Sequence, residues 1–327
     1  MRVFSPVAAG NGATVVHEIL SQRINGYEVT TYNPWLTLFP PFLTQYRKKD
    51  VDLIHTAAEY AFLLSPPSVP LVITFHNFVL DEFMRNYSSS LQWLHYRTDL
   101  KYFIQRSLRQ ASLVTAVSDA TADLVKHEMD YRGEIITIPN GVDTEIFRPS
   151  DTTRDQSDEI RVLFSGNPSI RKGAQWLFEI AKRLSPGIKI ICTSGLSKRW
   201  KLADSDRIEV VGNVPFSEMP KLYNSADILL MPSVREGLSL AILEAMACGL
   251  PVVTTDCSSM PELVKQGKGG YLCPIGDVDD FAQRINQLAA SARMRGEMGE
   301  YNRGIVERSY SQQRMVNSYR DLFNGLA

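Results

Sequence analysis

The chain has 327 residues, a formal net charge of −1 and a hydrophobic fraction of 44%. This length favours two domains, and the near-zero charge excludes a long-range attraction to nucleic acid. No stretch approaches the roughly 18 consecutive apolar residues that a membrane span needs. The four cysteines lack the spacing of a metal site and fit reduced thiols: Cys192, Cys248, Cys257 and Cys273. We therefore expect a cytoplasmic protein of two globular domains that has no nucleic-acid partner and stays peripheral to the inner face of any membrane it touches.

Strands and helices are expected to alternate through the first half of the chain. Apolar runs predict strands at 2–5, 27–32, 51–55, 70–75, 113–117 and 134–138. A helix is expected over 13–23, and a second one begins where Ser118 can cap it. The segment 33–42 is rich in proline and aromatic residues, which favours a loop or an irregular strand end. This alternation is typical of parallel sheets covered by helices.

The polar, acidic segment 149–159 has no apolar period and is expected to be a linker. After it, strands are predicted at 160–165, 188–193, 208–211, 228–231 and 271–273, with helices at 174–184, 215–224 and 277–290. We predict two Rossmann-like, doubly wound α/β domains, 1–149 and 150–309. A last helix within 310–327 is expected to pack back on the first domain, and the active site is expected in the cleft between the two domains.

The most informative stretch is 227–255, which predicts a strand, a turn, a helix over about 238–247 and a further strand from 250. Gly249 and Pro251 provide the usual helix stop. Glu236 lies in the turn after the first of these strands, where functional residues gather. An anionic ligand is favoured here, because helix N-termini present unpaired N–H groups beyond the carboxyl ends of parallel strands. Glu244 lies about two helical turns further on, and its pattern fits a solvated face and a ribose-binding position equally well.

The loop 165–173 also follows a strand and precedes a helix. It ends in Arg171, Lys172 and Gly173 and could offer an ammonium group and backbone N–H groups to a diphosphate. Taken alone, it more often describes a plain turn with a solvated Arg–Lys pair. Val214 follows another strand at the same edge, where backbone groups could face a base or form a simple turn.

In the first half, the segment 8–13 contains Gly10 and Gly12 between a strand and a helix. It lacks the third glycine and the acidic residue of a dinucleotide fingerprint, so it indicates only a loop whose backbone a ligand can approach. His76 follows the strand 70–75. A single histidine is usually a satisfied polar residue, but a strand end favours a role in positioning or proton transfer.

Together these motifs resemble the family-four retaining glycosyltransferases of the GT-B fold, over nearly the whole chain. The central motif is Glu236, seven residues, Glu244, followed by the segment 245–253. Other matching segments are 138–143 with Phe147 and Pro149, Val117-Ser118, Arg171-Lys172-Gly173 and Thr74-Phe75-His76.

The resemblance implies a role for each site residue. Glu244 would bind the donor ribose and Glu236 the hydroxyls of the donor sugar, while Lys172 would hold the diphosphate together with backbone amides around Gly237, Leu238 and Ser239. His76 would lie near the reacting carbon, and Gly12 would let its loop approach the donor phosphate. His76 and Glu236 are thus the expected catalytic residues.

The chain departs from the family at Asn167, where an arginine is usual. Either Arg171 supplies the second positive charge, or the diphosphate is held less strongly. The implied reaction is transfer from a nucleoside-diphosphate sugar with retention at the anomeric carbon. The leaving diphosphate oxygen guides the acceptor hydroxyl, so neither a carboxylate dyad nor a D-x-D metal motif is needed. We therefore expect a hexosyltransferase that uses no metal and no cofactor besides its donor.

The acceptor is expected to be a glycan or a lipid-linked molecule, in the synthesis of a bacterial surface polysaccharide. The predicted helical run 89–110 carries aromatic residues and interspersed basic residues. A core-packing helix with a solvated basic face explains it better than membrane contact does, but peripheral contact stays an alternative. Two other functions fit the same motifs: a nucleotide-sugar epimerase and a non-catalytic GT-B partner subunit.

Overall fold

The computed structural model describes residues 1–150, 159–193 and 206–326. Most of the linker predicted over 149–159 lies outside the described residues. The chain divides into two compact units, 1–140 with 313–327, and 141–312. The second unit thus begins at Gly141, earlier in the chain than the domain boundary expected after Pro149. Each unit is built on its own sheet, and they are described in turn.

Unit 1 contains a six-stranded parallel sheet in the order β2-β1-β3-β4-β5-β6. Its strands are β1 (Val3–Ala8), β2 (Tyr27–Tyr32), β3 (Leu53–Ala57), β4 (Leu71–Phe75), β5 (Leu113–Ala116) and β6 (Ile136–Thr137). All of them fall where apolar runs predict strands. The central strand β4 is buried at every residue, as expected for a parallel strand covered on both faces.

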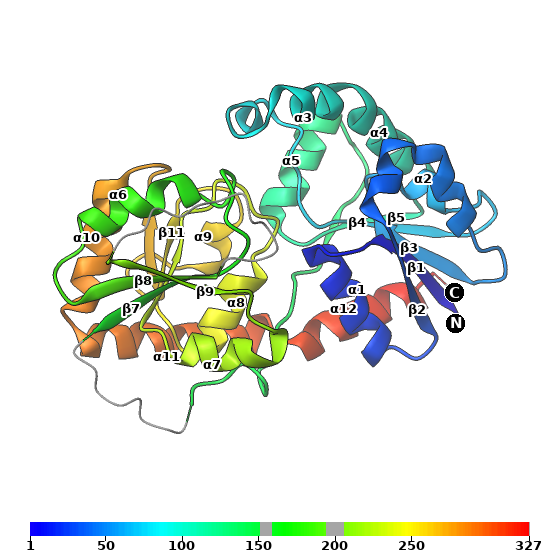
Figure 1. Cartoon of the computed structure of the whole chain (residues 1–327). Coiled ribbons are helices and arrows are strands. Elements are labelled where there is room, and N and C mark those ends of the chain that lie inside the picture. The colour runs from blue at the N-terminus through cyan, green and yellow to red at the C-terminus, as the bar shows by residue number, and fades with distance from the viewer. Residues whose placement is uncertain (151–158, 194–205, 327) are drawn as a thin grey trace. The chain divides into compact units, whose positions relative to one another are not determined.

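Helices cover both faces of this sheet (Figure 1). On one face, α1 (Gly12–Arg23) and α12 (Gln312–Asn324) bury apolar side chains against Val3, Leu53 and Val72. On the other face, α2 (Ala61–Leu64), α4 (Lys101–Gln110) and α5 (Asp119–Met129) pack over Ile54 and Ile73. Ser118 caps α5, its hydroxyl accepting a hydrogen bond from the backbone N–H of Thr121.

Two segments of unit 1 differ from the expected pattern. The segment expected as a loop at 33–42 forms two 3₁₀ helices, η1 (Pro34–Leu38) and η2 (Pro40–Tyr46). The run 89–110 is helical, as predicted, but a π-helical turn, η4 (Tyr96–Leu100), lies between α3 (Ser90–His95) and α4. A further 3₁₀ helix, η3 (Glu82–Tyr87), precedes it. Proline at the first turn of η1 and η2 favours such short helices, because its fixed φ suits a helix start.

Unit 2 contains a second six-stranded parallel sheet, in the order β12-β11-β10-β7-β8-β9. Its strands are β7 (Ile160–Phe164), β8 (Ile188–Thr193), β9 (Ile208–Gly212), β10 (Ile228–Met231), β11 (Val252–Thr255) and β12 (Gly270–Cys273). The predicted class, two doubly wound parallel α/β sheets, is confirmed.

In unit 2, α6 (Leu177–Lys182) and α10 (Val278–Ala289) pack over one face of the sheet (Figure 1). The other helices are α7 (Met219–Asn224), α8 (Leu240–Ala247), α9 (Met260–Leu263) and α11 (Ala292–Ser309), with 3₁₀ turns η5 (Ala174–Trp176) and η6 (Phe216–Glu218) before α6 and α7. The 18-residue α11 packs along α8 and was absent from the sequence prediction.

Helix α11 could not be predicted from the sequence because it buries little apolar surface. Its buried residues are Met298, Gly299, Asn302 and Val306, so a glycine and an asparagine occupy half of the packing face. The side-chain amide of Asn302 donates to the carbonyls of Leu250 (2.8 Å) and Gly269 (2.6 Å). Hydrogen bonds and a close backbone approach hold this helix, and neither produces the apolar period that identifies helices in a sequence.

The close approach gives a first prediction. A Cβ on Gly299 would overlap the carbonyl oxygen of Gly249, whereas a Cβ on Gly296 of the same helix meets nothing within 4 Å. We expect Gly299→Ala to lower the free energy of unfolding by about 1–3 kcal/mol through overpacking. Gly296→Ala should raise it by about 0.5–1 kcal/mol through helix propensity. Urea unfolding measures both, and equal effects of the two substitutions would contradict the close packing of α8 and α11.

Candidate active site

The loops after β7 and β10 lie side by side in unit 2. From β7 the chain winds outward through β8 and β9, and from β10 it winds the opposite way through β11 and β12. The strand order therefore reverses between β7 and β10, which are paired neighbours. Open α/β sheets bind ligands beyond the carboxyl ends of the strands at such a reversal. The topology thus singles out the β7 loop, 165–173, and the β10 loop, 232–239.

The β7 loop is fixed by hydrogen bonds and by glycine conformations. Gly166 donates its N–H to the hydroxyl of Thr193 at the end of β8 (2.8 Å). Gly173 has a φ of +74°, and a Cβ there would overlap the carbonyl of Pro232. The N–H of Val234 donates to the carbonyl of Arg171 (2.9 Å). Only glycine can occupy position 173 at this φ and this distance from Pro232. These contacts hold the β7 loop against the β10 loop.

A buried carboxylate joins the two loops. Glu236 is 8% exposed, and its Oε1 lies 2.9 Å from Nζ of Lys172 and 3.2 Å from Nη1 of Arg171. Burial opposes ionisation, but the charges of Lys172 and Arg171 outweigh it and hold the pKa of Glu236 below its usual range. The guanidinium of Arg171 also donates to the carbonyl of Arg235 (2.6 Å). Two cations therefore meet one buried carboxylate, and the side chain of Arg171 remains 34% exposed.

The start of α8 lies beside this cluster. Gly237, Leu238 and Ser239 are all buried, and the Ser239 hydroxyl caps the helix by accepting from the N–H of Ile242. The backbone of Glu236 is held by Ser258, whose hydroxyl accepts from the Glu236 N–H (3.2 Å) and donates to the Glu236 carbonyl (2.6 Å). The positive end of the helix dipole and the two side-chain cations thus act on the same region, which favours an anion.

Glu244, on α8, does not lie on a solvated face. The hydroxyl of Tyr223 donates to its Oε2 (2.7 Å) and lies 3.1 Å from the hydroxyl of Ser165. Burial raises the pKa of Glu244 to about 7, against the opposing effects of the Tyr223 hydrogen bond and the Lys172 charge. This carboxyl is therefore close to half-protonated at neutral pH, and further hydrogen-bond donors would favour its charged form.

A hollow of about 270 Å³ opens at the same edge of the sheet. It is lined by Ser165, Gly166, Asn167, Thr193, Asn213, Val214 and Met219. A Cβ on Gly166 would lie 3.8 Å from the Lys172 ammonium, so the hollow adjoins the charge cluster. The structure thus brings nine of the predicted site residues to one edge of unit 2: Asn167, Arg171, Lys172, Val214, Glu236, Gly237, Leu238, Ser239 and Glu244.

The other two predicted residues, Gly12 and His76, belong to unit 1. Gly12 begins α1, and Asn11 caps that helix by accepting from the N–H of Thr14 (3.0 Å). His76 follows β4, with its Nε2 3.1 Å from Nε2 of His17. Burial lowers the pKa of His76 to about 4, so the imidazole is neutral at physiological pH.

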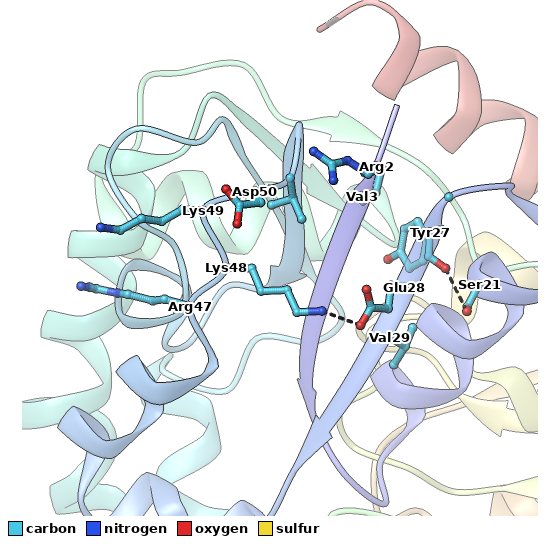
Figure 2. Close-up of a pocket in the computed structure, with 12 residues that line it drawn as sticks. Arg2, Val3, Ser21, Tyr27, Glu28, Val29, Arg47, Lys48, Lys49 and Asp50 are labelled. Atoms are coloured by element: carbon cyan, nitrogen blue, oxygen red, sulfur yellow. Dashed lines mark hydrogen bonds and ion pairs between the residues drawn. The ribbon is translucent and has the colours of Figure 1, made fainter.

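A larger hollow lies elsewhere, in unit 1. It has a volume of about 1000 Å³ and lies at the amino ends of β1 and β2, where Figure 2 shows Lys48 reaching Glu28 while Arg47 and Lys49 point away from it. Lys48 is ion-paired with Glu28 (2.5 Å). Because ligands of parallel sheets bind beyond the carboxyl ends of the strands, volume alone does not make this hollow the active site.

Sequence reasoning missed three residues at these edges. Tyr223 donates a hydrogen bond to Glu244, Thr193 fixes the β7 loop, and His17 contacts His76. Tyr223 lies on a short helix, and its role depends on a pairing across 21 residues. Polar side chains inside otherwise apolar strands and helices are the signal that could have found Thr193 and His17.

Two features are absent from the described part of the chain. No group of three or more His, Cys, Asp and Glu side chains there could hold a metal ion. No helix among the described residues combines the length and the apolar character of a membrane span.

Comparison with protein-family models identifies both halves of the chain. The model described as Glycosyltransferase Family 4 matches residues 2–146, and the one described as Glycosyl transferases group 1 matches residues 159–291. The chain belongs to glycosyltransferase family 4. The resemblance to glycosyltransferase family four that the motifs indicated is thereby confirmed.

Similar proteins include several named glycosyltransferases. N-acetyl-alpha-D-glucosaminyl L-malate synthase of Bacillus anthracis is 24% identical over 94% of this glycosyltransferase and 83% of its own length. D-inositol 3-phosphate glycosyltransferase of Paenarthrobacter aurescens is 30% identical, over 68% of this chain. The chain spans 60% of that enzyme's length and 56% of the length of the Arabidopsis thaliana sulfoquinovosyl transferase.

Solved GT-B structures share the fold of the glycosyltransferase. Sucrose-phosphate synthase of Thermosynechococcus elongatus matches with a TM-score of 0.81 at 17% identity, covering 100% of this chain and 99% of its own. HepE of Anabaena in complex with UDP-glucose matches with a TM-score of 0.80 at 19% identity, covering 99% and 100%.

The pKa of Glu244 gives the second prediction. A carboxyl whose pKa is raised by folding stabilises the protein below about pH 4.3 and loses that contribution as the pH rises through 7. Relative to Glu244→Gln, the wild type should therefore lose about 2–3 kcal/mol of unfolding free energy between pH 5 and pH 8.

Urea unfolding at the two pH values measures this difference. Glu209→Gln, on an exposed position of β9, is the matched control and should follow the wild type. Parallel pH curves for the wild type and Glu244→Gln would show that folding does not hold this carboxyl in its neutral form.

Proposed function

We propose that this glycosyltransferase transfers a sugar, with retention at the anomeric carbon, from a nucleoside-diphosphate sugar to a glycan or lipid-linked acceptor. The observation that carries the proposal is the cluster of Lys172, Arg171 and the buried Glu236 at the reversal of strand order, beside the start of α8. A sugar diphosphate needs positive charge and hydroxyl-binding carboxylates close together, and this cluster supplies both.

Each donor-binding residue has a proposed partner on the donor. Lys172 and the amides around Gly237, Leu238 and Ser239 bind the diphosphate. Glu236 accepts hydrogen bonds from sugar hydroxyls. Glu244 accepts them from the ribose, which converts it to the charged form and releases a proton. Val214 lines the adjoining hollow, and we assign this hollow to the base of the nucleotide.

Arg171 is the proposed source of the second positive charge, in place of the arginine that Asn167 replaces. The support is that its guanidinium reaches the same carboxylate oxygen as Lys172 does, Oε1 of Glu236. Asn167 lines the hollow next to this loop, where an amide can donate to a phosphate oxygen without contributing charge. The diphosphate would then be bound with the same net charge by a different residue.

The proposed reaction passes through an oxocarbenium-like transition state. The leaving phosphate oxygen accepts the proton of the acceptor hydroxyl, which attacks the same face of the anomeric carbon. Lys172 and Arg171 stabilise the negative charge that develops on the departing nucleoside diphosphate, while Glu236 fixes the orientation of the sugar. Because these side chains supply the charge stabilisation, we propose that neither a metal ion nor a further cofactor takes part.

On the acceptor side, we propose that His76 lies near the reacting carbon and that Gly12 lets its loop approach the donor phosphate. A Cβ on Gly12 would meet nothing within 4 Å, so a ligand group can come close to this backbone. The neutral imidazole of His76 can accept a proton or a hydrogen bond. One of the similar HepE structures is a complex with UDP-glucose and another is a complex with UDP and glucose, which supports a sugar-nucleotide donor here.

We further propose a role in the synthesis of a bacterial surface polysaccharide, with peripheral membrane contact through 89–110. The support is that Leu91, Leu94 and Tyr102 are 78%, 60% and 55% exposed among basic residues of α3, η4 and α4. Exposed apolar side chains beside cations suit an anionic lipid surface. Buried Leu100, Ile104 and Leu108 account for the core-packing half of this run.

Thermal unfolding with UDP, GDP, ADP and CMP tests the donor site. A ligand at about 100 times its dissociation constant stabilises the native protein by about 2.7 kcal/mol. We expect one nucleoside diphosphate to raise the Tm of the wild type and to have little effect on Lys172→Ala. Lys182→Ala removes a lysine paired with Glu179 on the surface of the same unit and should respond like the wild type.

Incubation of the wild type with the corresponding sugar nucleotide, with and without EDTA, then tests the chemistry. Retention predicts the donor's anomeric configuration in the product, and turnover should survive EDTA. Failure of every nucleotide to shift the Tm would favour a non-catalytic partner subunit. Turnover of the donor without incorporation into any acceptor would favour an epimerase.

Vesicle flotation tests the membrane contact. We expect the protein to float with vesicles containing anionic phospholipid, and Leu91→Ser combined with Leu94→Ser to reduce the bound fraction several-fold. Val210→Ser, which removes a 49%-exposed apolar side chain from β9, is the control and should bind as the wild type does. Equal binding by both variants would remove 89–110 from the contact.

A further inference from the structure

A chain of hydrogen bonds runs from His76 into the interior of unit 1. Nε2 of His76 lies 3.1 Å from Nε2 of His17, on α1. Nδ1 of His17 lies 2.7 Å from the hydroxyl of Tyr27, on β2, and this hydroxyl lies 2.6 Å from Nδ1 of His55, on β3. These four residues thus form a continuous path, and the hydroxyl of Ser5, on β1, is a second partner of His17, 2.8 Å from its Nδ1.

The path continues from His55 to the backbone. Nε2 of His55 lies 2.7 Å from the hydroxyl of Thr74, which lies 2.6 Å from the hydroxyl of Thr115. The Thr115 hydroxyl in turn donates to the backbone carbonyl of Ile73 (3.3 Å). Tyr319, on α12, also reaches the Thr74 hydroxyl (3.4 Å).

The two inner histidines are sealed from solvent and uncharged. His17 and His55 are fully buried and Tyr27 is 4% exposed. The rings of Tyr319 and Phe323 cover His55, with centroids 5.1 and 5.2 Å away. Burial, and for each histidine repulsion from the neighbouring ones, holds the pKa of His17 and His55 well below the usual range.

A neutral imidazole has one N–H donor and one acceptor nitrogen, and a phenol has a single proton to donate. Each neutral imidazole must therefore donate at one ring nitrogen and accept at the other. A hydroxyl donates once but can accept twice, so Ser5 and Tyr319 can join the path as further partners without setting its direction. The tautomer of His76 is thus coupled to the direction in which the whole path is ordered.

The backbone end fixes that direction, because a carbonyl oxygen can only accept. With Thr115 donating to Ile73, the Thr115 oxygen accepts from Thr74, and Thr74 accepts from Nε2–H of His55. Tyr27 then donates to Nδ1 of His55 and accepts from Nδ1–H of His17. The remaining nitrogen of His17 accepts from Nε2–H of His76.

We propose that His17, Tyr27 and His55 are positioning residues that hold His76 in its Nε2–H tautomer and keep its Nδ1 lone pair as the working acceptor. Within the described part of the chain, no other group is hydrogen-bonded to this Nδ1. Its ligand would be a sugar hydroxyl, which donates to Nδ1. The tautomer itself is a property of unit 1, whereas its effect on turnover rests on the role proposed for His76.

Tyr27→Phe provides the test, because it removes only the hydroxyl between His17 and His55. Tyr32→Phe is the matched control on the same strand: Tyr32 is also buried but packs against Tyr46 in the core of the opposite face. Long-range ¹H–¹⁵N correlation spectra of histidine-labelled protein report the tautomer of each ring directly, without any substrate.

We expect Nε2–H at His76 in the wild type and in Tyr32→Phe, and a mixture of tautomers in Tyr27→Phe. In turnover, Tyr27→Phe should lower kcat by about tenfold or more and leave KM for the donor within about twofold. Nδ1–H at His76 in the wild type, or an unchanged tautomer in Tyr27→Phe, would overturn the proposal.

If Tyr27→Phe does not fold, Thr115 provides a second route at the carbonyl end. Thr115→Val removes the hydroxyl at nearly constant shape and should give a mixture of tautomers at His76, whereas Thr115→Ser keeps the hydroxyl and should restore the wild-type spectrum. An unchanged spectrum in Thr115→Val would contradict the proposed direction. A wild type that transfers no sugar but shows these spectra would refute the proposed function and support the positioning path.

Discussion

A buried carboxylate between two cations is the constraint on which the candidate site depends. A charge removed from water is tolerated only when it is paired and hydrogen-bonded, and loss of one partner costs several kcal/mol. Glu236 therefore fixes the positions of Lys172 and Arg171, and through them the β7 loop against the β10 loop. The same three side chains provide the charge complement that a sugar diphosphate requires. Stability of the loop pair and affinity for the donor thus draw on one set of residues.

The start of α8 is positioned by a different kind of contact. Behind this helix, the backbones of Gly249 and Gly299 touch, and the guanidinium of Arg303 donates to the carbonyls of Ala247 and Phe147. These contacts lie at the carboxyl end of α8, whereas Glu236 and Ser239 lie at its start. A rigid support at one end of the helix therefore keeps its amide groups aimed at the other. Close packing and hydrogen bonds, rather than a large apolar interface, supply this support.

The parts of the molecule that could be predicted were those determined by neighbouring residues in the sequence. Strand β10, the turn and α8 followed from an apolar run, a cluster of turn residues and the stop at Gly249. The fold class and the family followed from such local patterns in a consistent order. The pairing of Lys172 with Glu236 could not be seen, because 64 residues separate them and only the sheet topology brings them together. Glu244 stayed undecided for the same reason, since its partner Tyr223 lies on another helix.

The last helix has a consequence for how the protein is made. Unit 2 is a continuous stretch, 141–312, whereas unit 1 combines residues 1–140 with 313–327. Met315, Val316, Tyr319 and Phe323 complete one face of the unit 1 core, and two of their rings cover His55. During synthesis at about 5–20 residues per second, the amino-terminal sheet must wait for the whole of unit 2 to emerge before its own core can close. The half of the protein that is translated first is therefore the half that finishes folding last, with an apolar face open to chaperones in the interval.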